Sequence, residues 1–292
     1  MKPPVEKTKK IKVLMYHNPF GQLIFPKFNV IQANIFMYIL YKLKSMVKDE
    51  DKLAYYQSHP NEFYVEVRSS EALKEFKLKR NNKPNIDNAL KFMEMLKQVE
   101  FRNTSKNKKS ITYSTLFIST KYTKDDNALK LWINPTSNMI PLFRNFIEGN
   151  FTKFALVDYY ALTGVYEKAL FRYISRYANS EPVKGNKRLY RVSKDELCDL
   201  LHISKESSYY KTGSIKSLIL NKAIKSLRYY FKDISVKCVY NHAKGNQDPH
   251  TYYDFTWTKD LRTKTAIPRS IDKPKVTKAA KFPDEDDSLL PF

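Results

Sequence analysis

The sequence predicts an α+β protein with two consecutive domains, each with helices followed by a β-hairpin, and a disordered C-terminal tail. The chain has 292 residues, which exceeds one average domain and accommodates two. The order of elements expected in the first half, helix, strand, two helices and hairpin, is repeated in the second half. The last segment is rich in Lys, Arg, Thr and Pro and lacks apolar periodicity. We therefore expect domains over residues 1–149 and 150–258 and a tail over 259–292.

The elements of the first domain follow from apolar spacing, with turn-forming residues between them. In chain order, the expected elements are a strand or short hairpin at 11–25, a core helix at 30–47, a strand at 63–68, helices at 71–78 and 85–99, and β-rich runs at 110–122 and 128–134. The two β-rich runs flank the turn-like residues 123–127, so we expect them to form a hairpin, or wing.

The second domain repeats this order. Ser193 and Glu196 have the spacing of a capping box, which predicts that a helix begins after Ser193. The polar residues 202–212 separate this helix from the next one, as in a helix-turn-helix. In chain order, the expected elements are a long core helix at 154–177, a strand at 188–192, the helix after Ser193, a helix at 214–231, and strands at 234–240 and 253–257.

The chain is strongly basic. It contains 52 Lys and Arg residues against 30 Asp and Glu, which gives a formal net charge of +22. Such an excess attracts polyanions through counterion release and long-range steering, so nucleic acid is the first partner to consider. Lys-rich chains also arise from AT-rich coding sequence, and the charge alone therefore leaves the partner open.

The helix at 214–231 carries the most specific signal for DNA. Its apolar residues Ile215, Leu218, Ile219, Ala223, Ile224 and Leu227 are expected to face the core. The other face is expected to present Ser214, Ser217, Asn221, Lys225 and Arg228, with Lys211, Lys216 and Lys222 beside them. Short hydrogen-bonding side chains suit base edges and cations suit phosphates, so this face fits a major groove. The alternative is an ordinary solvated helix face.

Two further regions are candidate DNA contacts. The tip of the second hairpin contains Lys244, which is suited to a phosphate or the minor groove, although most loop tips are polar. Near the start of the helix at 85–99, Lys83, Asn85 and Asn88 lie where free N–H groups would meet a phosphate. This helix could instead pack at a dimer interface.

Catalysis, cofactors and metal sites are not expected. The chain has 6 glycines and contains neither a G-x-x-x-x-G-K-S/T loop nor a G-x-G-x-x-G turn, the two Gly-rich motifs that bind nucleotide phosphates. It also lacks a His-x-His pair, with which metal-dependent nicking enzymes hold a cation beside a nucleophilic tyrosine. The tyrosine pairs, such as Tyr159-Tyr160, are interpreted as packing residues. Cys198 and Cys238 lie in apolar patterns and fit buried thiols in a reducing compartment. No run is apolar enough for a signal peptide or a membrane span, so we expect a soluble, cytoplasmic protein.

The second domain resembles plasmid replication initiators of the RepA/RepB/RepE type. The resemblance covers residues 150–258, and its order and spacing are more specific than any single motif. The matching strings are FTKFAL, YEKALFRYI, RLYRVSKDELCDLLHI, YYK, SIKSLILNKAIKSL and YDFTW. The N-terminal half matches more weakly. Lys222 departs from the pattern, because relatives often have proline there, which puts the register of the contacting residues in doubt.

The resemblance implies two winged-helix domains that bind double-stranded DNA. In that family, monomers bind direct repeats, called iterons, at an origin and help to open AT-rich DNA. Dimers bind inverted repeats at the initiator's own promoter and repress it, with the N-terminal domain supplying much of the dimer contact. The resemblance thus implies a monomer–homodimer equilibrium, a helix at 214–231 that reads the major groove, and host replication proteins as partners.

The end of the tail has its own pattern, four acidic residues followed by an apolar tip. The residues are Asp284, Glu285, Asp286, Asp287, Leu289, Leu290, Pro291 and Phe292. This tip resembles that of bacterial single-stranded-DNA-binding proteins, which docks onto replication and repair enzymes. Such docking is physically reasonable, because the acidic residues steer the encounter and the Phe292 ring can be buried in an apolar pocket of the partner. Two alternatives remain open: a sliding-clamp peptide that lacks the usual glutamine, and an acidic tail that only solubilises or shields the chain.

The expected function is therefore a plasmid replication initiator that is not an enzyme. A winged-helix transcription regulator would share the DNA surface but would not need a docking tail. A rolling-circle nickase would need a metal and a covalent tyrosine adduct, and the missing His pair argues against it.

Overall fold

The computed structural model of the chain describes residues 11–21, 25–76, 86–104, 111–146, 151–177, 187–240 and 251–258. Within these residues the first half contains β1 (Val13–His17), α1 (Asn18–Gly21), α2 (Val30–Val47), α3 (Glu50–Ser58), η1 (Pro60–Glu62), β2 (Tyr64–Arg68), α4 (Ser69–Phe76), α5 (Ile86–Lys97), β3 (Glu100–Thr104), β4 (Ile111–Thr115), β5 (Phe117–Thr123), β6 (Ala128–Ile133) and η2 (Ile140–Phe143).

Helix α2 has the bounds that the apolar spacing predicts, because its start is encoded locally. The Asn29 side chain accepts a hydrogen bond from the Gln32 N–H at 2.8 Å, and the Gln32 side chain accepts one from the Asn29 N–H at 3.0 Å. The whole stretch from Ile31 to Leu40 is buried, polar Gln32 and Asn34 included. Helix α2 is therefore surrounded by the rest of the fold and is not covered on one stripe alone.

The first sheet has the strand order β2-β6-β5, in which the last strand of the hairpin lies in the middle. Helices α4 and α5 lie between β2 and the hairpin in sequence, and α5 packs against β5. Helix, strand, two helices and a hairpin in this strand order form a winged helix.

The β-rich run at 110–122 proved to be two strands in different sheets, which corrects the expected single strand. It bends at the fully buried Leu116, whose N–H donates to the carbonyl of Val99 and whose carbonyl accepts from the Asn134 N–H. Before the bend, β4 pairs with β3, and after it β5 pairs with β6. The bend could not be predicted from the local sequence pattern of the run, because it depends on contacts with Val99 and Asn134, which lie outside the run.

The second half contains, within the described residues, β7 (Phe151–Ala155), α6 (Leu156–Ala161), α7 (Val165–Ser175), β8 (Lys187–Ser193), α8 (Lys194–Leu200), η3 (Ser208–Tyr210), α9 (Thr212–Ser214), η4 (Ile215–Leu220), α10 (Asn221–Leu227), β9 (Lys232–Tyr240) and β10 (Thr251–Thr258). Its sheet has the order β8-β10-β9, so the last strand again lies in the middle. The second half therefore repeats the winged-helix topology of the first, as the repeated order of elements predicted.

The prediction of one long helix at 154–177 is wrong, because the structure has β7, α6 and α7 there. Strand β7 pairs antiparallel with β1, so Phe154 lies opposite Leu14. Leu162 is extended, and α7 begins after Gly164, whose N–H donates to the Glu167 side chain at 3.2 Å. The division at 149/150 stays a prediction, although the β1–β7 pair joins residues on both sides of it.

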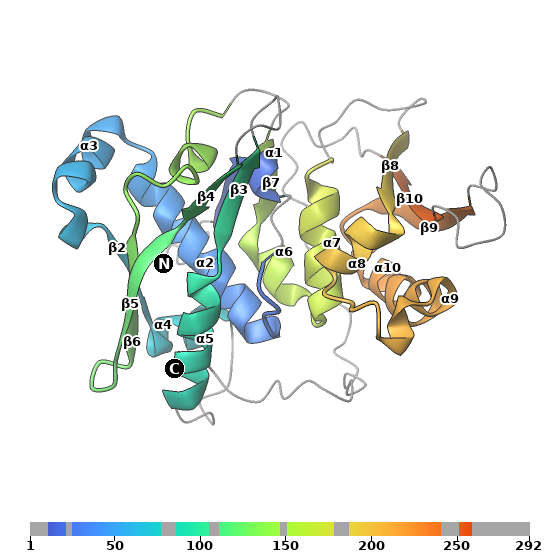
Figure 1. Ribbon diagram of the computed structural model, residues 1–292, viewed down its shortest axis with the longest axis horizontal. Helices are drawn as coiled ribbons and strands as arrows, with labels where there is room; N and C mark the ends of the chain where they lie inside the picture. The colour runs from blue at the N-terminus through green and yellow to red at the C-terminus, as the bar shows by residue number, and fades with distance from the viewer. Residues whose placement is uncertain are drawn as a thin grey trace, which may run out of the picture.

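The two halves lie side by side along the long axis of the molecule, with α3, β2, β5 and β6 at one end and α8, α9, α10 and β9 at the other (Figure 1). Helices α2, α6 and α7 lie between these ends, and α2 contacts both α6 and α7. Among the described helices, none has the length and hydropathy of a membrane span.

Candidate nucleic-acid interface

The predicted recognition helix is one helical stretch in three parts: α9, the π-helical turns of η4, and α10. It spans residues 212–227, not the predicted 214–231. Within it the Asn221 N–H donates to the carbonyl of Lys216, five residues back, as in a π-helix. Such turns hold more residues than α-helical turns, so they change which side chains share a face.

Two contacts hold this helix in its domain. At its start, the Tyr253 hydroxyl of β10 donates to the Thr212 carbonyl at 3.3 Å. Near its end, the Ser226 hydroxyl donates to Glu167 of α7 at 2.7 Å. Its inner face packs into the core with Ile215, Ile219, Leu220, Ala223, Ile224 and Leu227. The outer face is thereby held in one orientation.

The outer face is cationic. Between residues 211 and 228 the sequence has five cations, Lys211, Lys216, Lys222, Lys225 and Arg228, and no Asp or Glu. All five are exposed, as are Ser217 and Asn221, whereas Ser214 is half-buried. The structure thus brings the eight candidate residues of this helix onto one stretch of surface, with Ser214 at its margin. Their role in DNA contact stays a prediction.

Leu218 is a correction to the predicted core. The α-helical spacing assigned it to the buried face, but its side chain is 43% exposed, and Leu220 takes the buried place. The π-helical turns account for this exchange, because they shift the inward positions from 215, 218 and 219 to 215, 219 and 220. An exposed leucine therefore stands next to Ser217 on the cationic face.

The Ser217 hydroxyl is already engaged within the helix. It donates to the Gly213 carbonyl at 2.7 Å, a bond to the preceding turn. In this rotamer its oxygen offers only acceptor lone pairs to a ligand. Asn221, one turn further on, carries both a donor and an acceptor group and can pair with adenine in a bidentate manner.

Acidic groups of the helix-turn-helix are held by neighbouring residues. Asp195 accepts a hydrogen bond from the Tyr210 hydroxyl at 2.5 Å, and the Lys194 ammonium lies 4.0 Å from the centre of the Tyr210 ring. In the wing sheet, Arg191 and Asp254 form a two-point pair at 2.7 and 2.8 Å. Arg191 thus compensates the charge of Asp254, whereas Asp195 receives a hydrogen bond from a neutral hydroxyl.

The other predicted contact residues, or their side chains, lie outside the part of the chain that the structure describes. Lys83, Asn85 and Lys244 lie outside the described residues, and so does the side chain of Asn88 in α5. The tail residues Asp284, Glu285, Asp286, Asp287, Leu289, Leu290, Pro291 and Phe292 also lie outside them. On α5 the exposed residues include Glu94 beside Lys91 and Lys97, so the charge of its visible face is mixed.

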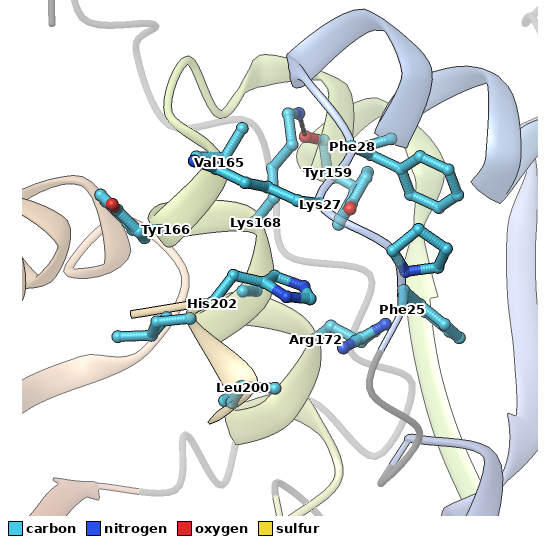
Figure 2. Close-up of a pocket in the computed structure, with 14 residues that line it drawn as sticks. Phe25, Lys27, Phe28, Tyr159, Val165, Tyr166, Lys168, Arg172, Leu200 and His202 are labelled. Carbon is cyan, nitrogen blue, oxygen red and sulfur yellow. Dashed lines mark hydrogen bonds between the residues drawn. The ribbon is translucent and has the colours of Figure 1, made fainter. Parts of the chain in front are cut away.

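A small junction cavity lies between the two halves, lined by residues 25–28 and by residues of α7 and the end of α8 (Figure 2). Its volume is about 60 Å³, which is small beside the roughly 300–1,000 Å³ of usual ligand pockets. The guanidinium of Arg172 lies 3.8 Å from the centre of the Phe25 ring, and burial lowers the pKa of this arginine. The cavity is part of the packing between the halves.

Three potential nucleophiles, two tyrosines and one thiol, have raised pKa values. Burial raises the pKa of Tyr159, and burial followed by the charge of Asp158 raises the pKa of Tyr230 to about 12. Cys198 is buried, which raises its pKa to about 11, and Cys238 is half-buried; both are free. The raised pKa keeps Tyr159, Tyr230 and Cys198 protonated at neutral pH.

Comparison with known proteins identifies the architecture. A solved structure of the Pi initiator protein in complex with iteron DNA superposes with a TM-score of 0.56 at 16% sequence identity, covering 87% of this chain and 99% of that one. This likeness confirms the predicted α+β winged-helix fold. No curated protein matches the chain. The family model "Initiator Replication protein, WH1" matches residues 13–175, more than half of the sequence, and the chain therefore belongs to the initiator replication protein family.

Proposed function

We propose that this protein initiates replication of a plasmid by binding direct repeats in double-stranded DNA with the helix at 212–227. The observation that carries the proposal is the outer surface of residues 211–228, which has five exposed cations and no acid. It belongs to a winged helix of an initiator family member. The complex of the similar Pi protein with iteron DNA supports repeats as the target. Lysines set affinity through phosphates, and Asn221 sets part of the sequence preference.

The test is a footprint of the full chain on the DNA that flanks its own gene, at physiological salt with unrelated competitor DNA. Protection of regularly spaced direct repeats beside an AT-rich stretch is the expected result. Protection of a single inverted repeat at the promoter would indicate a transcription regulator instead. Absence of specific protection would overturn the proposal.

Two variants separate affinity from readout. Lys225→Ala should weaken binding to all sequences and reduce the slope of log K against log salt by about 1. Asn221→Ala should lower discrimination between sequences by about 1 to 3 kcal/mol if it pairs with adenine. Lys52→Ala is the matched control, since this exposed lysine lies on α3 at the opposite end of the molecule (Figure 1). Equal losses on every sequence for Asn221→Ala would remove it from the readout role.

Further steps of the proposal concern strand opening, regulation and partners. The protein opens AT-rich DNA as a monomer, represses its own promoter as a dimer, and acts without catalysing a reaction of its own. Its acidic tip recruits a host replication protein. Phe292→Ala should leave repeat binding unchanged and abolish capture of that partner from a defined set of purified replication proteins. If this variant still captures the partner, the tip is not the docking site, and the tail would then only solubilise or shield the chain.

A further inference from the structure

We infer that Leu218 reads the 5-methyl group of a thymine in the major groove and thereby selects an A·T pair within the bound site. The inference deepens the proposed function and rests on it. It assigns a specificity role to a residue whose apolar character and spacing alone place it in the core.

The geometry begins with the π-helical turns. They bury Leu220 and turn Leu218 outward, to 43% exposure, between Ser217 and the next exposed turn at Asn221 and Lys222. Leu218 is therefore an apolar side chain on a surface whose other exposed residues are polar or cationic.

Exposure alone does not call for an explanation, because single apolar residues are common on protein surfaces. Leu189 of β8, for example, is 39% exposed in the same domain. The position of Leu218 is what distinguishes it. It lies on the helix proposed to enter the groove, where one base edge is apolar: thymine adds a methyl group to the donors and acceptors that every base pair presents.

The neighbour of Leu218 supports the same base composition. Asn221 is three residues further along the same helix and is also exposed. Its amide is the usual partner of the adenine N6 and N7 groups. A thymine-contacting leucine and an adenine-contacting amide within one turn of the same helix both favour A·T pairs in the recognised sequence.

The experiment uses the full chain and a random pool of double-stranded oligonucleotides. The sequence enriched by the wild-type protein is resynthesised with uracil in place of each thymine in turn, which removes one methyl group at a time. At one position, uracil should weaken wild-type binding roughly fourfold, the effect expected for one buried methyl group. Leu218→Ala should bind the thymine duplex more weakly by a similar factor and should not distinguish uracil from thymine there.

Controls separate the possible failures. Leu189→Ala should retain the full thymine preference, and thermal unfolding should show that Leu218→Ala is folded. If the wild type enriches a sequence but Leu218→Ala retains the same sensitivity to uracil, the inference fails and the proposed function stands. If Leu218→Ala loses only cooperative binding to adjacent repeats, the residue contacts a second copy and the inference also fails. If the wild type enriches no sequence, both fail.

Discussion

Lys168 offers a direct test of how the two halves are held together. Its side chain is 1% exposed, and its ammonium donates to the Asn34 side-chain oxygen at 2.8 Å and to the Tyr159 carbonyl at 2.6 Å, the second bond being drawn in Figure 2. The ammonium also lies 4.5 Å from the centre of the Tyr159 ring. Lys168 on α7 thus connects to α2, 134 residues earlier in the chain.

The perturbation is Lys168→Met, which retains an unbranched apolar side chain and removes the charged donor. The buried Asn34 oxygen then loses this donor, and a buried acceptor left without a partner costs about 1 to 3 kcal/mol. The Tyr159 carbonyl still accepts from the Leu162 N–H, and removal of the ammonium also removes its desolvation cost. We expect the free energy of unfolding to fall by about 1 to 3 kcal/mol.

The assay is urea unfolding of the full chain, with Lys52→Met as a matched control on an exposed helix. The control should change the free energy of unfolding by less than about 0.5 kcal/mol. In the double variant Lys168→Met/Asn34→Leu the second substitution should cost at least about 1 kcal/mol less than in the wild type, because its partner is already gone. A loss below about 0.5 kcal/mol for Lys168→Met, or additivity of the two substitutions, would show that the Lys168–Asn34 contact does not stabilise the junction.

Two further predictions concern the neighbours of this junction. Asp158 is buried, and burial raises its pKa from 3.8 to about 6. The folded state therefore takes up a proton that the unfolded state lacks between pH about 4 and about 6, so stability falls as the pH rises through that window. Asp158→Asn should remove this dependence in thermal melts and stabilise the protein at neutral pH by at most about 3 kcal/mol; an unchanged pH profile would contradict it. Glu167 accepts from the N–H groups of Thr163 and Gly164 and from the Ser226 hydroxyl. Glu167→Ala should therefore lower the free energy of unfolding by about 1 to 2 kcal/mol, and a loss within error of zero would show that α7 does not depend on this cap.

Local signals were sufficient where the chain makes its own hydrogen bonds. The start of α8 is an example, since Ser193 accepts from the Glu196 N–H at 3.2 Å and the Glu196 side chain accepts from the Ser193 N–H at 3.1 Å. The start of α2 has a similar box. These contacts join residues three positions apart, so a single window of sequence contains both partners.

The predicted outer face of the recognition helix was also largely determined by its sequence. Its cations and Asn221 are exposed as expected, since charged side chains are rarely buried without a partner. Leu218 was placed wrongly because apolar spacing assumes α-helical turns, and the π-helical turns shift the inward face by one residue. That shift depends on what the helix packs against.

The α+β class, the repeated order of elements, the bounds of α2, the start of α8 and the basic face at 211–228 could all be predicted from the sequence. Three features could not: that β7 is a strand, that the chain changes sheets at Leu116, and that Leu218 faces outward. Each of these depends on a partner far away in sequence: β1 for β7, Val99 and Asn134 for Leu116, and the domain core for the helix register. Short apolar runs satisfy a helix and a strand equally well, and the available partner selects between them.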